Sequence, residues 1–79
     1  MGVLDKIIGI ISEVAGCNKD EITETTNLID LGLDSLDIIN IEVDLEDEFG
    51  IDVPYDVGQS FETVEDVVFA VKERMGQDA

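Results

Sequence analysis

Leu31-Gly32-Leu33-Asp34-Ser35-Leu36-Asp37 is the stretch that organises the chain, because it turns directly into a long apolar and acidic segment that runs to Phe49. Asp34 is typical of a helix N-cap, and Asp37 adds negative charge to a first turn whose unpaired backbone N–H groups favour it. The pattern therefore predicts a helix over 35–49 with Ser35 exposed at its N-terminus. Free N–H donors and the positive end of the helix dipole suit that position to a phosphate group.

Apolar residues lie on two opposite sides of this predicted helix, at about 100° per residue. The expected core face is made of Ile38, Ile41, Leu45 and Phe49. The other side carries Leu36, Ile39 and Val43, with Asp37, Asn40, Asp44 and Asp47 around them. Two interpretations are open: a central helix buried on both sides, or an exposed apolar strip with an acidic margin that docks partner proteins.

Apolar residues at helical spacing predict two further main helices. One covers 3–15 and ends at Gly16; the other begins after an N-cap at Thr63 and runs to about Met75. The long connection over 17–33 needs apolar anchors in so small a domain. Its candidate anchors are Ile22, Leu28 and Ile29.

No alternating strand pattern occurs, so the sequence predicts an all-α fold. We expect a small four-helix bundle, with three main helices, one short helix and a long loop between the first two helices. The 79 residues suffice for one domain (1–79) with a modest core, but not for an ordinary enclosed substrate cleft as well.

Twenty acidic residues against four basic ones give a net charge of -16 and disfavour nucleic acid and anionic membranes as partners. No apolar run approaches the roughly 20 residues needed to span a membrane, and no secretory signal pattern opens the chain. The single Cys17 allows no intramolecular disulfide and favours a reducing compartment. We therefore expect a cytoplasmic protein without membrane insertion.

Asp34-Ser35-Leu36, with Leu31-Gly32 before it and an acidic amphipathic helix after it, resembles the prosthetic-group site of acyl carrier proteins. The likeness spans nearly the whole chain. It implies that Ser35, between Asp34 and Leu36, carries 4'-phosphopantetheine, transferred from coenzyme A by a phosphopantetheinyl transferase. The arm's thiol would hold an acyl chain as a thioester. The family also has a short third helix at about 55–59, although Gly58 is a poor helix residue.

The resemblance further implies a monomeric carrier that meets acyl-transferring and fatty-acid or polyketide synthesis enzymes through their basic docking patches. The implied partner face consists of Leu36, Asp37, Ile39, Asn40, Val43, Asp44 and Asp47. The implied acyl pocket is lined by Ile38, Ile41, Leu45 and Phe61. An aromatic ring at Phe61 would narrow that pocket. Glu42 departs from the family, which usually has an apolar residue at this position.

Other functional classes, such as an enzyme or a calcium-binding protein, explain less of the sequence. Catalysis by Ser35 would need a base, but the chain has no histidine, and Asp34 and Asp37 are explained as cap and helix-start charges. A calcium loop starting at Asp30 would need glycine and glutamate where Ser35 and Ile41 stand, so we expect no dedicated metal site. The remaining alternatives are an acidic interaction module without a prosthetic group and an aminoacyl or peptidyl carrier.

Overall fold

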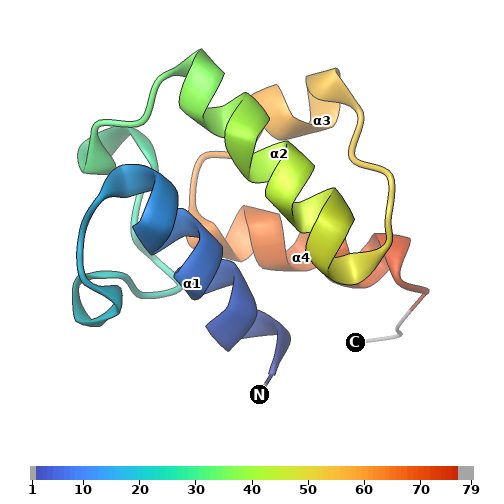
Figure 1. The fold of residues 1–79 in the computed structure, drawn as a ribbon, viewed down its shortest axis with the longest axis horizontal. Helices are drawn as coiled ribbons and strands as arrows, with labels where there is room; N and C mark the ends of the chain where they lie inside the picture. The colour runs from blue at the N-terminus through green and yellow to red at the C-terminus, as the bar shows by residue number, and fades with distance from the viewer. Residues whose placement is uncertain (1, 77–79) are drawn as a thin grey trace.

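Four α-helices form the fold in a computed structural model that describes residues 2–76 (Figure 1). The helices are α1 (Val3–Ala15), α2 (Ser35–Phe49), α3 (Tyr55–Gln59) and α4 (Val64–Arg74). Two single 3₁₀ turns, η1 (Lys19–Glu21) and η2 (Ile29–Leu31), lie in the connection between α1 and α2. Within residues 2–76 no β-strand forms, which confirms the predicted all-α bundle. None of the helices in this part of the chain has the length and apolar character needed to cross a membrane.

The helix ends follow from local chemistry. Asp66 accepts hydrogen bonds from the N–H groups of Glu62 and Thr63, at 2.9 and 3.1 Å, and so closes a capping box at the start of α4. Gly50 ends α2 in the left-handed region with φ of 64°, and its N–H donates to the Glu46 carbonyl at 2.9 Å. The predicted boundaries of α1 and α2 are therefore confirmed.

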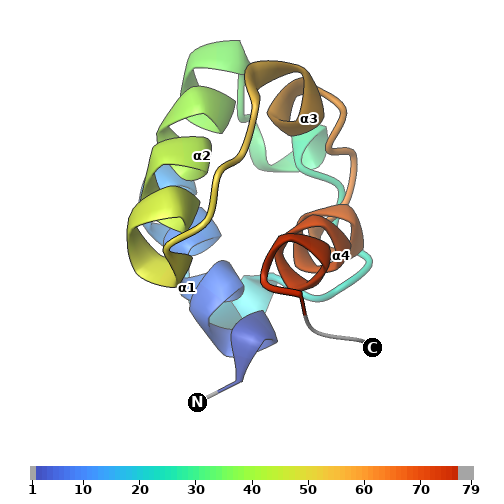
Figure 2. The same cartoon turned by 90° about the vertical axis from the view of Figure 1, so that its right-hand side faces the viewer.

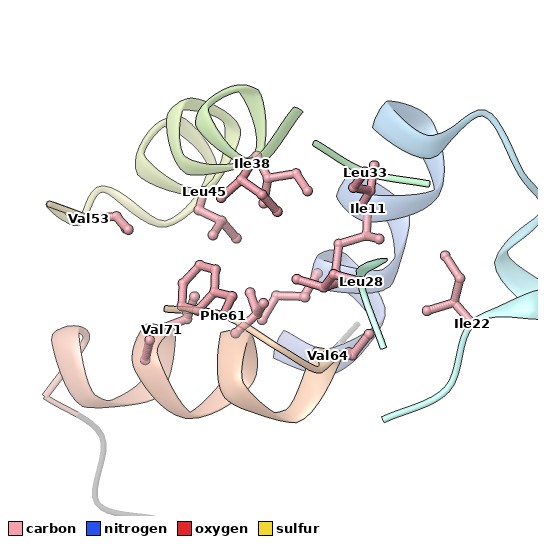
Figure 3. Close-up of a cluster of buried hydrophobic side chains, with 14 residues drawn as sticks. Ile11, Ile22, Leu28, Leu33, Ile38, Leu45, Val53, Phe61, Val64 and Val71 are labelled. Carbon is pink, nitrogen blue, oxygen red and sulfur yellow. The ribbon is translucent and has the colours of Figure 1, made fainter. Parts of the chain in front are cut away.

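The apolar core lies between α1, α2 and α4 (Figure 3). Its fully buried helical residues are Ile7, Ile11, Ile41, Leu45, Val64, Val67 and Val71. Figure 2 shows α3 beside the N-terminal half of α2, reached by the extended segment over 51–54 that returns along α2. The short helix packs chiefly against α2.

The long connection is held against the segment that precedes α4. Leu28 donates its N–H to the Glu62 carbonyl at 2.8 Å, and Val64 donates to the Thr26 carbonyl at 3.1 Å. Ile22 and Leu28 are buried, as predicted for anchors. The prediction for Ile29 is wrong, because its side chain is 75% exposed. Ile29 begins the 3₁₀ turn η2 directly after the buried Leu28, and none of the three residues of this turn is buried.

Candidate functional site

A tight turn places Ser35 at the start of α2. Gly32 has φ of 80°, a left-handed conformation that reverses the chain after η2 and favours glycine. Leu33, the next residue, is buried in the core near Ile11 (Figure 3). The turn is therefore fixed on one side by an apolar anchor, and the chain enters α2 at Ser35 with its side chain exposed.

Asp34 and Asp37 form a reciprocal cap around Ser35. Asp34 Oδ1 accepts the Asp37 N–H at 2.9 Å, and Asp37 Oδ2 accepts the Asp34 N–H at 3.1 Å. This geometry confirms Asp34 as the N-cap and adds the second half of a capping box. Both carboxylates next to the serine thus hold the helix start, as expected if neither acts as a catalytic base.

The residues around Ser35 fit a covalently attached phosphodiester. The hydroxyl lies at the positive end of a 15-residue helix and is open to solvent. Leu36, beside it, is 69% exposed. From the other side, the Gln59 side-chain amide donates to the Ser35 carbonyl at 3.4 Å and links the end of α3 to the start of α2.

The second apolar side of α2 is open to solvent. Leu36 and Val43 are 69% and 52% exposed, and Ile39 between them is half-buried. The surrounding Asn40, Asp44 and Asp47 are exposed, and Asp37 is half-buried. The structure therefore excludes the interpretation in which α2 is buried on both sides. We call Leu36, Ile39 and Val43 the apolar strip.

Basic residues of the first part of the chain lie beside the acidic margin of this strip. A groove of about 570 Å³ separates α1 from α2, with Lys6, Lys19, Asp44 and Asp47 among its lining residues. Lys6 Nζ lies 3.3 Å from Glu48 Oε2 and 6.0 Å from the centroid of the Phe49 ring. The groove therefore brings two lysines close to acidic residues in the C-terminal half of α2.

The four residues expected to line an acyl pocket meet in the core. Ile38, Ile41 and Leu45 project from α2, and Phe61 lies between α2 and α4 (Figure 3). All four are at least nine-tenths buried. Phe61 also borders a hollow of about 490 Å³, whose other lining residues come from the segment over 57–66 and from α4 rather than from α2. The structure brings the four together as packed core residues.

Glu42 is a buried residue that the sequence analysis did not place at the site. It is only 6% exposed, and its Oε2 atom has no hydrogen-bond partner. Burial raises its pKa above the ordinary value of 4.5, and the carboxylates of Glu46 and Asp56 raise it further, while the Gln59 amide opposes them. The available signal was position: Glu42 follows Ile38 by four residues and therefore shares its face of α2.

The carboxyl group of Glu42 lies directly against Gly58 of α3. A Cβ atom at Gly58 would lie 2.6 Å from Glu42 Cγ and would overlap the carboxyl group. Gly58 has no Cβ and is itself buried, so the glutamate occupies the space that a larger residue would fill. The glycine that looked like a weak helix residue is thus the reason that Glu42 fits between α2 and α3.

Comparison with known proteins was consistent with this geometry. Residues 5–71 match the family model described as the phosphopantetheine attachment site. The chain is 42% identical over 72 residues to an acyl carrier protein of Clostridium perfringens, covering 90% of this chain and 95% of that one. It is 39% identical over 75 residues to the acyl carrier protein of Lactobacillus acidophilus, covering 94% of each.

Solved structures agree in fold. The crystal structure of an acyl carrier protein from Thermotoga maritima superposes with a TM-score of 0.80 at 26% identity, covering 94% of this chain and 87% of that one. The acetyl actinorhodin acyl carrier protein from Streptomyces coelicolor superposes with a TM-score of 0.73 at 22% identity, covering 95% of this chain and 92% of that one. At this identity the likeness shows the fold alone. With the family match and these relatives, the chain belongs to the acyl carrier proteins, which hold acyl groups on 4'-phosphopantetheine and are carriers rather than enzymes.

Proposed function

We propose that Ser35 is the residue of this chain that carries 4'-phosphopantetheine. The observation that carries the proposal is a comparison of its three serines. Ser12 is buried and donates to the Gly9 carbonyl at 2.9 Å, and Ser60 donates to the Val57 carbonyl at 2.6 Å. Ser35 instead stands exposed at the N-terminus of α2. It combines an accessible hydroxyl with the helix end that favours a phosphate group.

The chain positions this hydroxyl, and a phosphopantetheinyl transferase supplies the chemistry. Ser35 Oγ forms the new bond to phosphorus of coenzyme A, and the nucleotide part of coenzyme A leaves. The base that takes the serine proton comes from the transferase, because Asp34 and Asp37 are engaged in the capping box. The bound arm supplies a thiol that holds an acyl group as a thioester.

The apolar strip and its acidic margin form the proposed partner face. Leu36, Ile39 and Val43 offer apolar contact, and Asp37, Asn40, Asp44 and Asp47 suit basic patches on fatty-acid or polyketide synthesis enzymes. The same charge opposes pairing of two copies through this face, so we propose that residues 1–79 act as a monomeric carrier. Its encounters are brief, because a carrier must leave one enzyme to reach the next.

The compartment that we propose is the cytoplasm. Cys17, the single cysteine of the chain, is a free and partly buried thiol. A lone thiol of this kind fits a reducing environment.

Intact mass after incubation with coenzyme A and a broad-specificity phosphopantetheinyl transferase tests the attachment site. The wild-type chain and Ser60→Ala should each gain one phosphopantetheine, whereas Ser35→Ala should gain none. Ser60→Ala is the matched control because it removes the other exposed serine hydroxyl. If folded wild-type protein gained no mass, the acidic interaction module would become the better explanation.

A further inference from the structure

One oxygen of the buried Glu42 carboxyl group, Oε2, is a hydrogen-bond acceptor without a donor in the described structure, although the Gln59 side chain interacts with the carboxyl group. The residue is more than nine-tenths buried, and its Oε2 atom lies out of contact with solvent. A buried carboxylate is stable only when a donor or a cation compensates for the lost water. The interface between α2 and α3 therefore buries an acceptor atom whose natural complement is an N–H or O–H group.

The position of Glu42 relates this acceptor to the attachment site. Seven residues separate it from Ser35, which is close to two helical turns, so both lie on the same face of α2 about 10 Å apart along its axis. Gln59 lies between Ser35 and Glu42. Its side-chain amide donates to the Ser35 carbonyl at 3.4 Å, and its hydrogen bonding to the Glu42 carboxyl group opposes the rise that burial causes in the pKa of that group. A group tethered at Ser35 that folds back along α2 meets Gln59 first and Glu42 next.

The helix that covers Glu42 is short. α3 has five residues, and Pro54 at its N-cap makes no side-chain hydrogen bond to it. Gly58 contributes no side chain to the interface with α2, and the Glu42 carboxyl group fills its place. Because a one-turn helix has little stability of its own, α3 can separate from α2 more easily than any main helix can leave the core.

We propose that the interface between α2 and α3 opens to bind acyl cargo that carries a hydroxyl or amino group, with the Glu42 carboxylate as the acceptor. The proposal rests on Ser35 as the attachment residue and adds the class of cargo. A plain saturated chain entering this space would desolvate the carboxylate further and supply no donor. A donor-bearing chain restores the missing hydrogen bond, and an amino group adds an opposite charge.

Loading the chain with stable amide-linked analogues of the acylated arm tests this preference. The probes are hexanoyl, 3-hydroxyhexanoyl, 6-hydroxyhexanoyl and 6-aminohexanoyl chains, each attached with the transferase and verified by intact mass. We expect at least one donor-bearing chain to raise the melting temperature of the wild-type protein by about 4 °C or more over the hexanoyl form, as one hydrogen bond to a charged group implies. The backbone amide resonance of Gly58 should shift with the same chain.

Three variants identify the group responsible. Glu42→Leu should lose the preference for donor-bearing chains and favour hexanoyl, whereas Glu42→Gln should keep a preference for hydroxyl chains and lose any preference for the amino chain. Asp44→Asn, which removes an exposed acid from the same helix, should behave like the wild type. The proposal is wrong if no donor-bearing chain exceeds hexanoyl in the wild type, or if Glu42→Leu retains the preference. Failure to load at Ser35 would instead overturn the attachment site.

Discussion

Burial of Glu42 imposes a pH-dependent cost on the folded chain. Its pKa is raised above 4.5, first by burial and then by Glu46 and Asp56, so the folded state binds the proton more tightly than the unfolded state does. The contribution of Glu42 to stability is therefore fully present at low pH. It is lost as the pH rises from about 4.5 through the higher pKa that Glu42 has in the folded state. At neutral pH the ionised side chain opposes folding.

This residue predicts a stabilising substitution with a defined pH profile. Glu42→Gln should raise the free energy of unfolding at pH 7.5 by roughly 1 kcal/mol more than Asp44→Asn does, because Glu42 is a buried charge with one unpartnered oxygen whereas Asp44 is exposed. The advantage should shrink as pH falls toward 4.5. Urea denaturation of the three proteins across this range measures it, and an advantage equal at all pH values would contradict the burial argument.

The contact between α2 and α3 rests on the match of Glu42 with Gly58. In the wild-type chain, Gly58→Ala would force the glutamate out of its place, because the added methyl overlaps the carboxyl group. Once Glu42 is shortened to alanine, the same methyl has room, and alanine gains about 1 kcal/mol over glycine in a helix. The effect of one substitution should therefore depend on the other.

A double-mutant cycle measures that dependence. Gly58→Ala should destabilise the wild-type chain or leave its stability unchanged, and it should stabilise Glu42→Ala, giving a coupling of about 1 kcal/mol or more by urea denaturation. Additive effects of the two substitutions on stability would show that α3 adjusts so that residues 42 and 58 do not contact each other.

Capping and periodicity explain which helices could be predicted from the sequence. Asp34 and Thr63 are strong N-caps, and the regular apolar spacing behind them fixes α2 and α4. α3 carries no such signal, so it was expected only from the family resemblance. Ile29 was misplaced because periodicity does not resolve the direction of side chains in a single 3₁₀ turn.

The site was predictable in part for a similar reason. The exposure of Ser35 follows from its place at the capped start of α2, whereas the helix wheel left open whether Leu36 and Val43 are exposed. The wheel also places Glu42 on the core side, but a glutamate there contradicts the usual rule for buried positions. Glu42 fits at this buried position because Gly58, sixteen residues later in the chain, has no side chain there. Only the packing of α3 on α2 shows that these two residues meet.

The apolar strip of α2 should contribute to partner binding without contributing to stability. Leu36→Ala should reduce kcat/KM for phosphopantetheine attachment roughly tenfold, about 1.4 kcal/mol, because an exposed leucine buried by a partner loses its contacts. The melting temperature should stay nearly constant, since Leu36 is 69% exposed. Phe69→Ala on α4 is the matched control, with a side chain 67% exposed outside the strip. Equal loss in both variants would refute a role specific to the strip.

At the scale of the whole molecule, charge repulsion is the main cost. A net charge of -16 is confined to a body of about 30 × 26 × 19 Å. In its described part the ion pairs are Lys6 with Glu48 at 3.3 Å and Arg74 with Glu73 at 3.8 Å. The four side chains are all at least partly exposed, and surface pairs of this kind contribute at most about 1 kcal/mol each. The packed valines and isoleucines of the core must therefore offset most of the repulsion.

This balance predicts a marked dependence of stability on salt. The Debye length is about 30 Å at 0.01 M and about 8 Å at 0.15 M ionic strength, so at low salt every carboxylate repels charges across the molecule, whereas at 0.15 M only near neighbours interact. The melting temperature should rise by several degrees over this range, since about 1 kcal/mol corresponds to roughly 4–8 °C for a domain of this size. Scanning calorimetry in sodium chloride measures the rise, and a variant with Asp44→Asn and Asp47→Asn should melt higher at low salt and gain less from added salt. A melting temperature independent of ionic strength would mean that the carboxylates repel one another as strongly in the unfolded chain as in the folded one.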